Sequence, residues 1–152
     1  DSSTALGSPD PSPDGQAIAF SRGSQIVVRD LQSGTERVLT TGSIPRWSPD
    51  GQWIAYTTTA PGPLQSPWVK TISQNGEPGV TGPTLAPGEF GPFYYDWTSD
   101  GSYLVTGQSL PPVPNTFGAS FGRWTFVDRV TGRRATWGLS PDIVQISVRP
   151  ER

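Results

Sequence analysis

The sequence predicts an all-β protein built from three copies of one four-stranded antiparallel unit. Three observations indicate this class. A turn motif containing Asp-Gly occurs three times, an apolar segment that closes on a second glycine turn follows each copy, and 18 Gly and 17 Pro occur among 152 residues. Six Trp, four Tyr and six Phe argue against disorder, because disordered segments are poor in aromatic residues. Short strands joined by many tight turns account for both features of the composition.

The turn motif lies near the start of each unit. Residues 11–20 read PSPDGQAIAF, residues 47–56 read WSPDGQWIAY, and residues 97–106 read WTSDGSYLVT. In Ser-Pro-Asp-Gly, proline presets φ, aspartate is favoured in the turn, and glycine accepts the left-handed conformation that follows. Such a turn with its bulge closes a tight hairpin. The third copy carries Thr98-Ser99 instead of Ser-Pro, which we expect to loosen the turn without changing its Asp-Gly core.

The second block supplies the third strand of each unit and its closing turn, in residues 25–34 (QIVVRDLQSG), 67–76 (PWVKTISQNG) and 123–132 (RWTFVDRVTG). Short final strands are expected at 36–40, 77–81 and 133–137. The turn glycines Gly15 and Gly51 lie 36 residues apart, and Gly51 and Gly101 lie 50 apart, which is typical of β-propeller blades with insertions. The whole chain, 1–152, is therefore predicted to be one propeller part-domain, with blades at about 11–41, 44–82 and 93–138.

The motif SPDGQxIAF/Y, followed by a hydrophobic strand, a glycine turn and the closing Val38-Leu39-Thr40, resembles the WD40-like (PD40-type) repeat of TolB-like propellers. The resemblance covers nearly the whole chain and is weakest in the third copy. It implies periplasmic or secreted propellers that bind other proteins, and also propeller modules attached to some peptidases. It implies no catalytic residues, because the repeat is structural. Since the chain has no Met, we expect either a removed signal peptide or a piece of a longer chain.

The absent residue types limit the chemistry. Without His or Cys, the chain itself excludes a thiolate nucleophile, a Ser-His-Asp triad and the usual zinc ligands, so no metal or cofactor is expected. The net charge of −2 without a basic run argues against nucleic acid, and no apolar stretch reaches the roughly 20 residues of a membrane span. Only carboxylate chemistry remains, and no spacing pairs Glu89, Asp96 or Asp142 as a glycosidase needs. The sequence favours a protein that is not an enzyme.

Three aspartates, Asp14, Asp50 and Asp100, precede the turn glycines Gly15, Gly51 and Gly101. Three equivalent carboxylates suggest either a metal site or caps of the turns. One carboxylate per blade, each before a turn glycine, favours the structural interpretation. Trp47 and Trp97 are similarly interpreted as residues that pack the blades.

The ends of the chain pose a closure problem, since propellers close with typically four to eight blades. Gly7, Pro9 and Pro11 make residues 5–11 a poor first strand, whereas residues 143–148 (IVQISV) read as a good one. Two interpretations remain open. Residues 143–148 either complete the first blade of another copy, giving a six-bladed ring or a filament, or they open a fourth repeat of a longer protein.

If the four strands of each unit are called A to D in chain order, alternating strand directions place the tight A–B and C–D turns on one face, and the B–C and D–A loops on the other. The B–C loops lengthen from 21–24 to 58–66 and 108–122, and the D–A connection over 82–92 is also long. These loops carry the predicted partner-binding residues Leu64, Leu85, Phe90, Phe93, Leu110, Phe117 and Phe121. Long loops on a rigid scaffold usually carry binding, although these could instead cover their own blade edges. The leading hypothesis is a binding or scaffold protein. The alternatives are a gating or docking module of a larger secreted hydrolase or peptidase, or of a multi-subunit complex, and a filament subunit.

Overall fold

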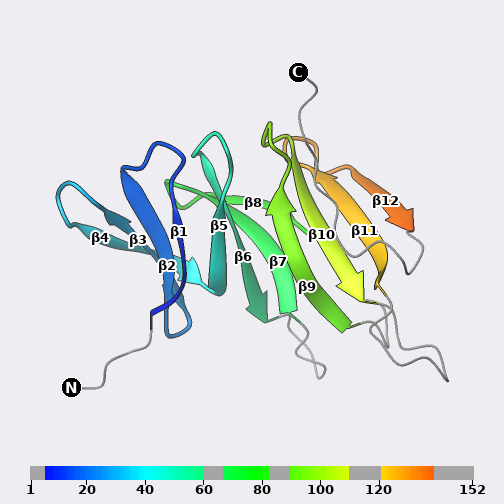
Figure 1. The fold of residues 1–152 in the computed structure, drawn as a ribbon, viewed down its shortest axis with the longest axis horizontal. Helices are drawn as coiled ribbons and strands as arrows, with labels where there is room; N and C mark the ends of the chain where they lie inside the picture. The colour runs from blue at the N-terminus through cyan, green and yellow to red at the C-terminus, as the bar shows by residue number, and fades with distance from the viewer. Residues whose placement is uncertain (1–5, 60–66, 83–89, 110–120, 139–152) are drawn as a thin grey trace.

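Three separate four-stranded antiparallel sheets make up the computed structural model, which describes residues 6–59, 67–82, 90–109 and 121–138 (Figure 1). The described residues contain no helix. Each sheet is a meander whose strands pair in chain order. Blade 1 contains β1 (Leu6–Pro11), β2 (Ala17–Arg22), β3 (Gln25–Asp30) and β4 (Glu36–Thr41). Blade 2 contains β5 (Ser43–Trp47), β6 (Trp53–Thr59), β7 (Pro67–Ser73) and β8 (Pro78–Thr81), and blade 3 contains β9 (Phe90–Trp97), β10 (Tyr103–Ser109), β11 (Phe121–Asp128) and β12 (Arg134–Gly138).

The three blades stand side by side like the vanes of a fan, with their first strands close together and β4 and β12 at opposite sides (Figure 1). Strand β5 contacts both β1 of the preceding blade and β9 of the following one. No described strand pairs across two blades, so no backbone ladder joins one sheet to the next. The predicted all-β class with three four-stranded antiparallel blades is confirmed.

The expectation that residues 5–11 make a poor first strand is wrong. Strand β1 pairs with β2 from Leu6 opposite Arg22 to Pro11 opposite Ile18. A bulge between Gly7 and Asp10 removes Ser8 and the proline at position 9 from the ladder, and Ser8 adopts a positive φ of 48°. Because β1 is also the edge strand of its sheet, its prolines break no ladder on the other side. Blade 1 therefore has its own first strand. Residues 143–148 lie outside the described residues, so their role stays a prediction.

The core lies between the blades rather than within one sheet. Between blades 1 and 2, Ile26 and Val28 pack against Ile54, Tyr56 and Ile72. The alternate residues of blade 2 point the other way, so a second cluster joins blades 2 and 3 through Ala55, Val69, Tyr95, Trp97, Leu104 and Val127. Ile26, Ile54 and Leu104 are 0% exposed, and burying each such side chain contributes about 1.5–3 kcal/mol. Each blade is thus stabilised mainly by its neighbours.

Candidate functional site

The Asp-Gly turns carry the same hydrogen bonds in blades 1 and 2. In blade 2 the Ser48 hydroxyl donates to Asp50 Oδ1 at 2.6 Å and accepts the Trp53 N–H at 2.9 Å. The Gln52 N–H donates to the same carboxylate oxygen at 3.1 Å, and the Gly51 N–H donates to the Ser48 carbonyl at 2.9 Å. Gly51 has φ of 69°, the left-handed region that favours glycine. The aspartates thus lie in turns as caps, hydrogen-bonded by the residues around them.

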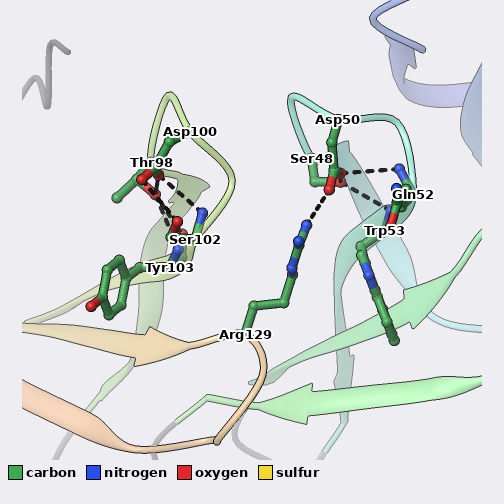
Figure 2. Close-up of polar contacts among 9 residues, drawn as sticks. All are labelled: Ser48, Asp50, Gln52, Trp53, Thr98, Asp100, Ser102, Tyr103 and Arg129. Atoms are coloured by element: carbon green, nitrogen blue, oxygen red, sulfur yellow. Dashed lines mark hydrogen bonds and ion pairs between the residues drawn. The ribbon is translucent and has the colours of Figure 1, made fainter.

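Blade 3 keeps this network despite its different sequence, as Figure 2 shows beside blade 2. The Thr98 hydroxyl donates to Asp100 Oδ1 at 2.6 Å and accepts the Tyr103 N–H at 3.0 Å. Ser102 adds a bond from its own hydroxyl to Asp100 Oδ2 at 2.8 Å. The expected loosening of this turn is therefore not seen, because threonine supplies the same hydroxyl as serine. A hydroxyl at the first turn position is the sequence feature common to all three copies, and sequence reasoning missed its role.

A second set of caps closes the C–D turns, where only the glycines had been identified. Asp30 accepts the N–H groups of Gln32 and Ser33 at 2.9 and 2.7 Å. Asp128 does the same for Val130 and Thr131 at 3.0 and 2.8 Å. In blade 2 the Ser73 hydroxyl replaces the carboxylate and accepts the N–H groups of Asn75 and Glu77. These turns could have been identified from the sequence. The pattern is an Asp four residues before a Gly, or a Ser three residues before a Gly in a shorter turn.

The caps lower the pKa of these carboxylates below its ordinary value. Hydrogen bonds from Thr98 and then Ser102 lower the pKa of Asp100 to about 2, from an ordinary value of 3.8. The Ser12 hydroxyl is the main cause that lowers the pKa of Asp14, and the Ser33 N–H is the main cause for Asp30. Burial raises the pKa of Asp50, but hydrogen bonds from Ser48 and Arg129 outweigh it, so the pKa of Asp50 is also lowered. All four groups are held as anions at neutral pH.

Charged and polar contacts tie neighbouring blades together. Asp10 of blade 1 accepts the Trp47 N–H of blade 2 at 2.6 Å and lies 3.6 Å from the Arg46 guanidinium. Asp50 of blade 2 forms an ion pair with Arg129, which reaches across from the C–D turn of blade 3 (Figure 2). At each of the two interfaces, the following blade therefore offers an arginine to a carboxylate of the preceding one.

Two aromatic side chains of β9 also hydrogen-bond to the backbone of β5. The Trp97 Nε1–H donates to the Arg46 carbonyl at 3.1 Å, and the Tyr95 hydroxyl donates to the Ile44 carbonyl. Burial raises the pKa of Tyr95 to about 12, so its hydroxyl stays protonated and remains a donor. Trp47 and Trp97, interpreted above as packing residues, both lie in the clusters between blades.

The predicted partner-binding residues are only partly located by the structure. Phe90 and Phe93 belong to β9, and Phe121 is the first residue of β11, so their assignment to loops is wrong. Phe90 and Phe121 pair within the blade 3 ladder, and Phe93 lies between residues that do. The strands of blade 3 are therefore longer than the motif indicated. Leu64, Leu85, Leu110 and Phe117 lie outside the described residues. The binding role of all seven stays a prediction.

Chemistry-bearing residues are scattered in the part of the chain that the structure describes. Within residues 6–59, 67–82, 90–109 and 121–138, no group of three or more Asp or Glu side chains is placed to hold a metal ion. The same ranges contain no helix that is long and apolar enough to cross a membrane. Asp96 accepts the Tyr94 hydroxyl at 3.2 Å and the Trp97 N–H at 2.8 Å, as a structural acceptor would.

Comparison with solved structures decides the architecture. The putative TolB from Agrobacterium tumefaciens matches 92% of this chain with a TM-score of 0.62 and 19% identity, and TolB from Acinetobacter baumannii matches 86% with a TM-score of 0.56 and 19% identity. The chain has a TolB-like β-propeller fold. The β-propeller domain of the Trilobed protease from Pyrococcus furiosus is also similar, at 14% identity over 88% of this chain with a TM-score of 0.60. The resemblance to TolB-like propellers expected from the motif is thus confirmed at the level of fold.

This propeller chain spans 52% of the Agrobacterium protein, 31% of the Acinetobacter protein and 42% of the protease domain. No protein-family model and no curated protein matches the sequence.

Proposed function

We propose that this chain is a non-enzymatic propeller module that binds or scaffolds protein partners through the face bearing its long B–C and D–A connections. The observation that carries the proposal is the contrast between the two faces of the fan. The A–B and C–D turns are short, they are capped by side chains, and they hydrogen-bond to one another. In blade 1, for example, the Leu31 N–H donates to the Gln16 carbonyl at 2.8 Å. The opposite ends of the strands carry the long connections.

The strand bounds show this contrast directly. In blade 1 only Gly23 and Ser24 join β2 to β3, whereas residues 60–66 join β6 to β7 and residues 110–120 join β10 to β11. The connection between blades 2 and 3 also leaves from this face. Variable connections on a scaffold fixed by inter-blade bonds are the usual place for recognition. Their apolar residues Leu64, Leu85, Leu110 and Phe117 are the proposed contacts, and Phe117 is the proposed anchor.

The test is a variant with Leu64→Ser, Leu85→Ser, Leu110→Ser and Phe117→Ser, compared with a control that carries Gln16→Ser, Gln52→Ser and Gln32→Ser on the capped face. The three glutamines are exposed, and their backbone N–H or C=O groups make the bonds of these turns. Phe90, Phe93 and Phe121 stay unchanged because they belong to strands. Partners are captured by cross-linking in the native extract and quantified by mass spectrometry. We expect partner recovery to fall at least tenfold only in the loop variant. Equal recovery from both variants would refute the assignment.

A second candidate function is a propeller module of a larger secreted peptidase or complex. The similarity to the Trilobed protease propeller domain, of which this chain spans 42%, favours it. An antibody against this chain separates the candidates on a blot of the native source. A band far above 16.3 kDa that co-purifies with peptidase activity supports the module. A band near 16.3 kDa supports the free binding protein.

We also propose a periplasmic or extracellular location, which the TolB-like fold supports. Cell fractionation tests it, since recovery of the chain with cytoplasmic markers would contradict it.

A further inference from the structure

The three blades differ at one position that borders the interface with the following blade. Ala17, Trp53 and Tyr103 begin β2, β6 and β10, each two residues after the turn glycine of its motif. Ala17 packs against the cluster between blades 1 and 2, and Trp53 packs against the cluster between blades 2 and 3. The second interface therefore has an indole ring where the first has only a methyl group.

In blade 2 the Trp53 ring lies across the two strands that follow its own. A Cβ atom at Gly79 of β8 would lie 2.5 Å from Trp53 Cζ3 and 2.9 Å from Cε3, and it would also meet the hydroxyl of Thr71 of β7. The ring thus rests against Gly79 beside Thr71, which is 2% exposed. Glycine at position 79 leaves the room that this ring occupies.

Blade 1 has a pocket at the equivalent place. Val28 is equivalent to Thr71, since each lies two residues before the residue that caps the C–D turn. Arg37 pairs opposite Val28 in β4. A pocket of about 460 Å³ opens here, and its walls include Ala17, Val28, Asp30, Arg37, Trp47 and Gln74. The pocket therefore lies where a ring at position 17 would stand.

The pocket has an apolar floor and a polar rim. Val28 and Trp47 are each 8% exposed, whereas Asp30 and Arg37 are exposed. The Arg37 guanidinium donates to the Gln74 carbonyl, so it bridges blades 1 and 2 beside the pocket. A concave apolar site of about 300–1,000 Å³ with a few polar groups is typical of small-ligand binding.

Two polar groups of the pocket residues have hydrogen-bonding capacity that the chain does not use. The bonds that Asp30 accepts from Gln32 and Ser33 all go to Oδ1, which leaves Oδ2 as an acceptor. The buried Trp47 Nε1–H has no hydrogen-bond partner in the described part of the chain. At the equivalent position in blade 3, the Trp97 Nε1–H donates to a backbone carbonyl. A buried donor without a partner indicates that the surroundings of Trp47 are incomplete.

We propose that the pocket between blades 1 and 2 binds an indole-type group, a flat aromatic ring that carries an N–H donor. The ring takes the place that Trp53 holds in blade 2, over Val28 and beside Ala17. Its N–H donates to Asp30 Oδ2, and the Arg37 guanidinium covers its face in a cation–π contact. A free small molecule or a tryptophan side chain of a protein partner can supply this group. The site lies at the capped turns, away from the loop face of the proposed function.

Titration of indole into the nitrogen-15-labelled full chain tests the site by NMR, with the Trp47 Nε1–H signal as the reporter. The decisive variant combines Ala17→Trp with Arg37→Gly, because this pair copies Trp53 and Gly79 of blade 2. We expect its indole affinity to fall about tenfold or more, since its own ring fills the pocket. Arg37→Gly alone is the matched control. It leaves the pocket open, so we expect it to weaken binding only about two- to fivefold, through loss of the cation–π contact.

A second probe tests the donor. 1-Methylindole has the same ring without the N–H, so we expect it to bind about fivefold or more weakly than indole. N-acetyl-tryptophanamide distinguishes the two sources of the group. Binding as tight as that of indole supports a partner's side chain, and binding of indole alone supports a free molecule.

Saturable shifts of the Trp47 signal that persist in Arg37→Gly and disappear in the double variant support the proposal. The amide signals of blade 3 show in each case that the variant is folded. No shift of the Trp47 signal in the unmodified chain overturns the proposal. Equal indole affinity in the double variant and in Arg37→Gly also overturns it, and so does equal affinity for indole and 1-methylindole.

Discussion

Removing the Ser48 hydroxyl tests whether the turn network stabilises the fold. Ser48 is 0% exposed, and Ser48→Ala removes its bond to the Asp50 carboxylate and leaves the Trp53 N–H without its acceptor. A hydrogen bond to a charged group contributes about 1.5–3 kcal/mol and a neutral one about 0.5–1.5. The expected loss in the free energy of unfolding is therefore about 2–4 kcal/mol.

Urea denaturation followed by tryptophan fluorescence measures this loss. With a slope of about 2 kcal/mol/M, the midpoint should fall by about 1–2 M at unchanged slope. Ser48→Thr is the matched control, because Thr98 makes the same two bonds in blade 3 and shows that such a turn holds the extra methyl group. We expect it to be clearly more stable than the alanine variant. A Ser48→Ala protein that unfolds at the wild-type midpoint would refute the reasoning.

Three further predictions concern the same scaffold. A double-mutant cycle of Asp50→Asn and Arg129→Gln measures the ion pair, whose side chains are 29% and 21% exposed. We expect a coupling energy of about 1 kcal/mol that added salt weakens. Zero coupling would show that the ion pair does not join the blades. Because folding lowers the pKa of Asp100 from 3.8 to about 2, its contribution is present above pH 4 and lost as the pH falls toward 2, so thermal melts should show stability falling across that window. In the Asp100→Asn variant that part of the fall should be absent. Gly42→Ala would place a methyl group against the Tyr56 ring and 2.7 Å from the Thr57 carbonyl oxygen, so it should lower the free energy of unfolding in urea by about 1–3 kcal/mol. An unchanged midpoint would contradict the close approach.

The features that local chemistry determines were predictable from the sequence. Gly15, Gly51 and Gly101 all have φ near 70°, as the turn motif required, and the strands follow the apolar blocks. The first strand was not predicted because proline lacks the N–H that a strand ladder uses. That rule applies only where the N–H would take part in a ladder. In β1 a bulge and an edge position remove that constraint at Pro9 and Pro11.

Contacts between blades could not be predicted in the same way. The pairing of Arg129 with Asp50 joins residues 79 apart in sequence, and it depends on how far one blade rotates against the next. Nothing in the local pattern distinguishes Arg129 from the other surface arginines. The Ser48 and Thr98 hydroxyls were within reach of sequence reasoning, since an alignment of the three copies shows a hydroxyl at that position in each.

The central claim is that the Asp-Gly hairpins begin three separate antiparallel sheets that pack face to face. Amide–amide nuclear Overhauser effects in the isotope-labelled chain test it most directly. The account predicts cross-strand contacts from β4 to β3 alone and from β5 to β6 alone, with side-chain contacts between Ile54 and Val28 across the blades. A backbone ladder between β4 and β5, which would make one continuous sheet of blades 1 and 2, would contradict it.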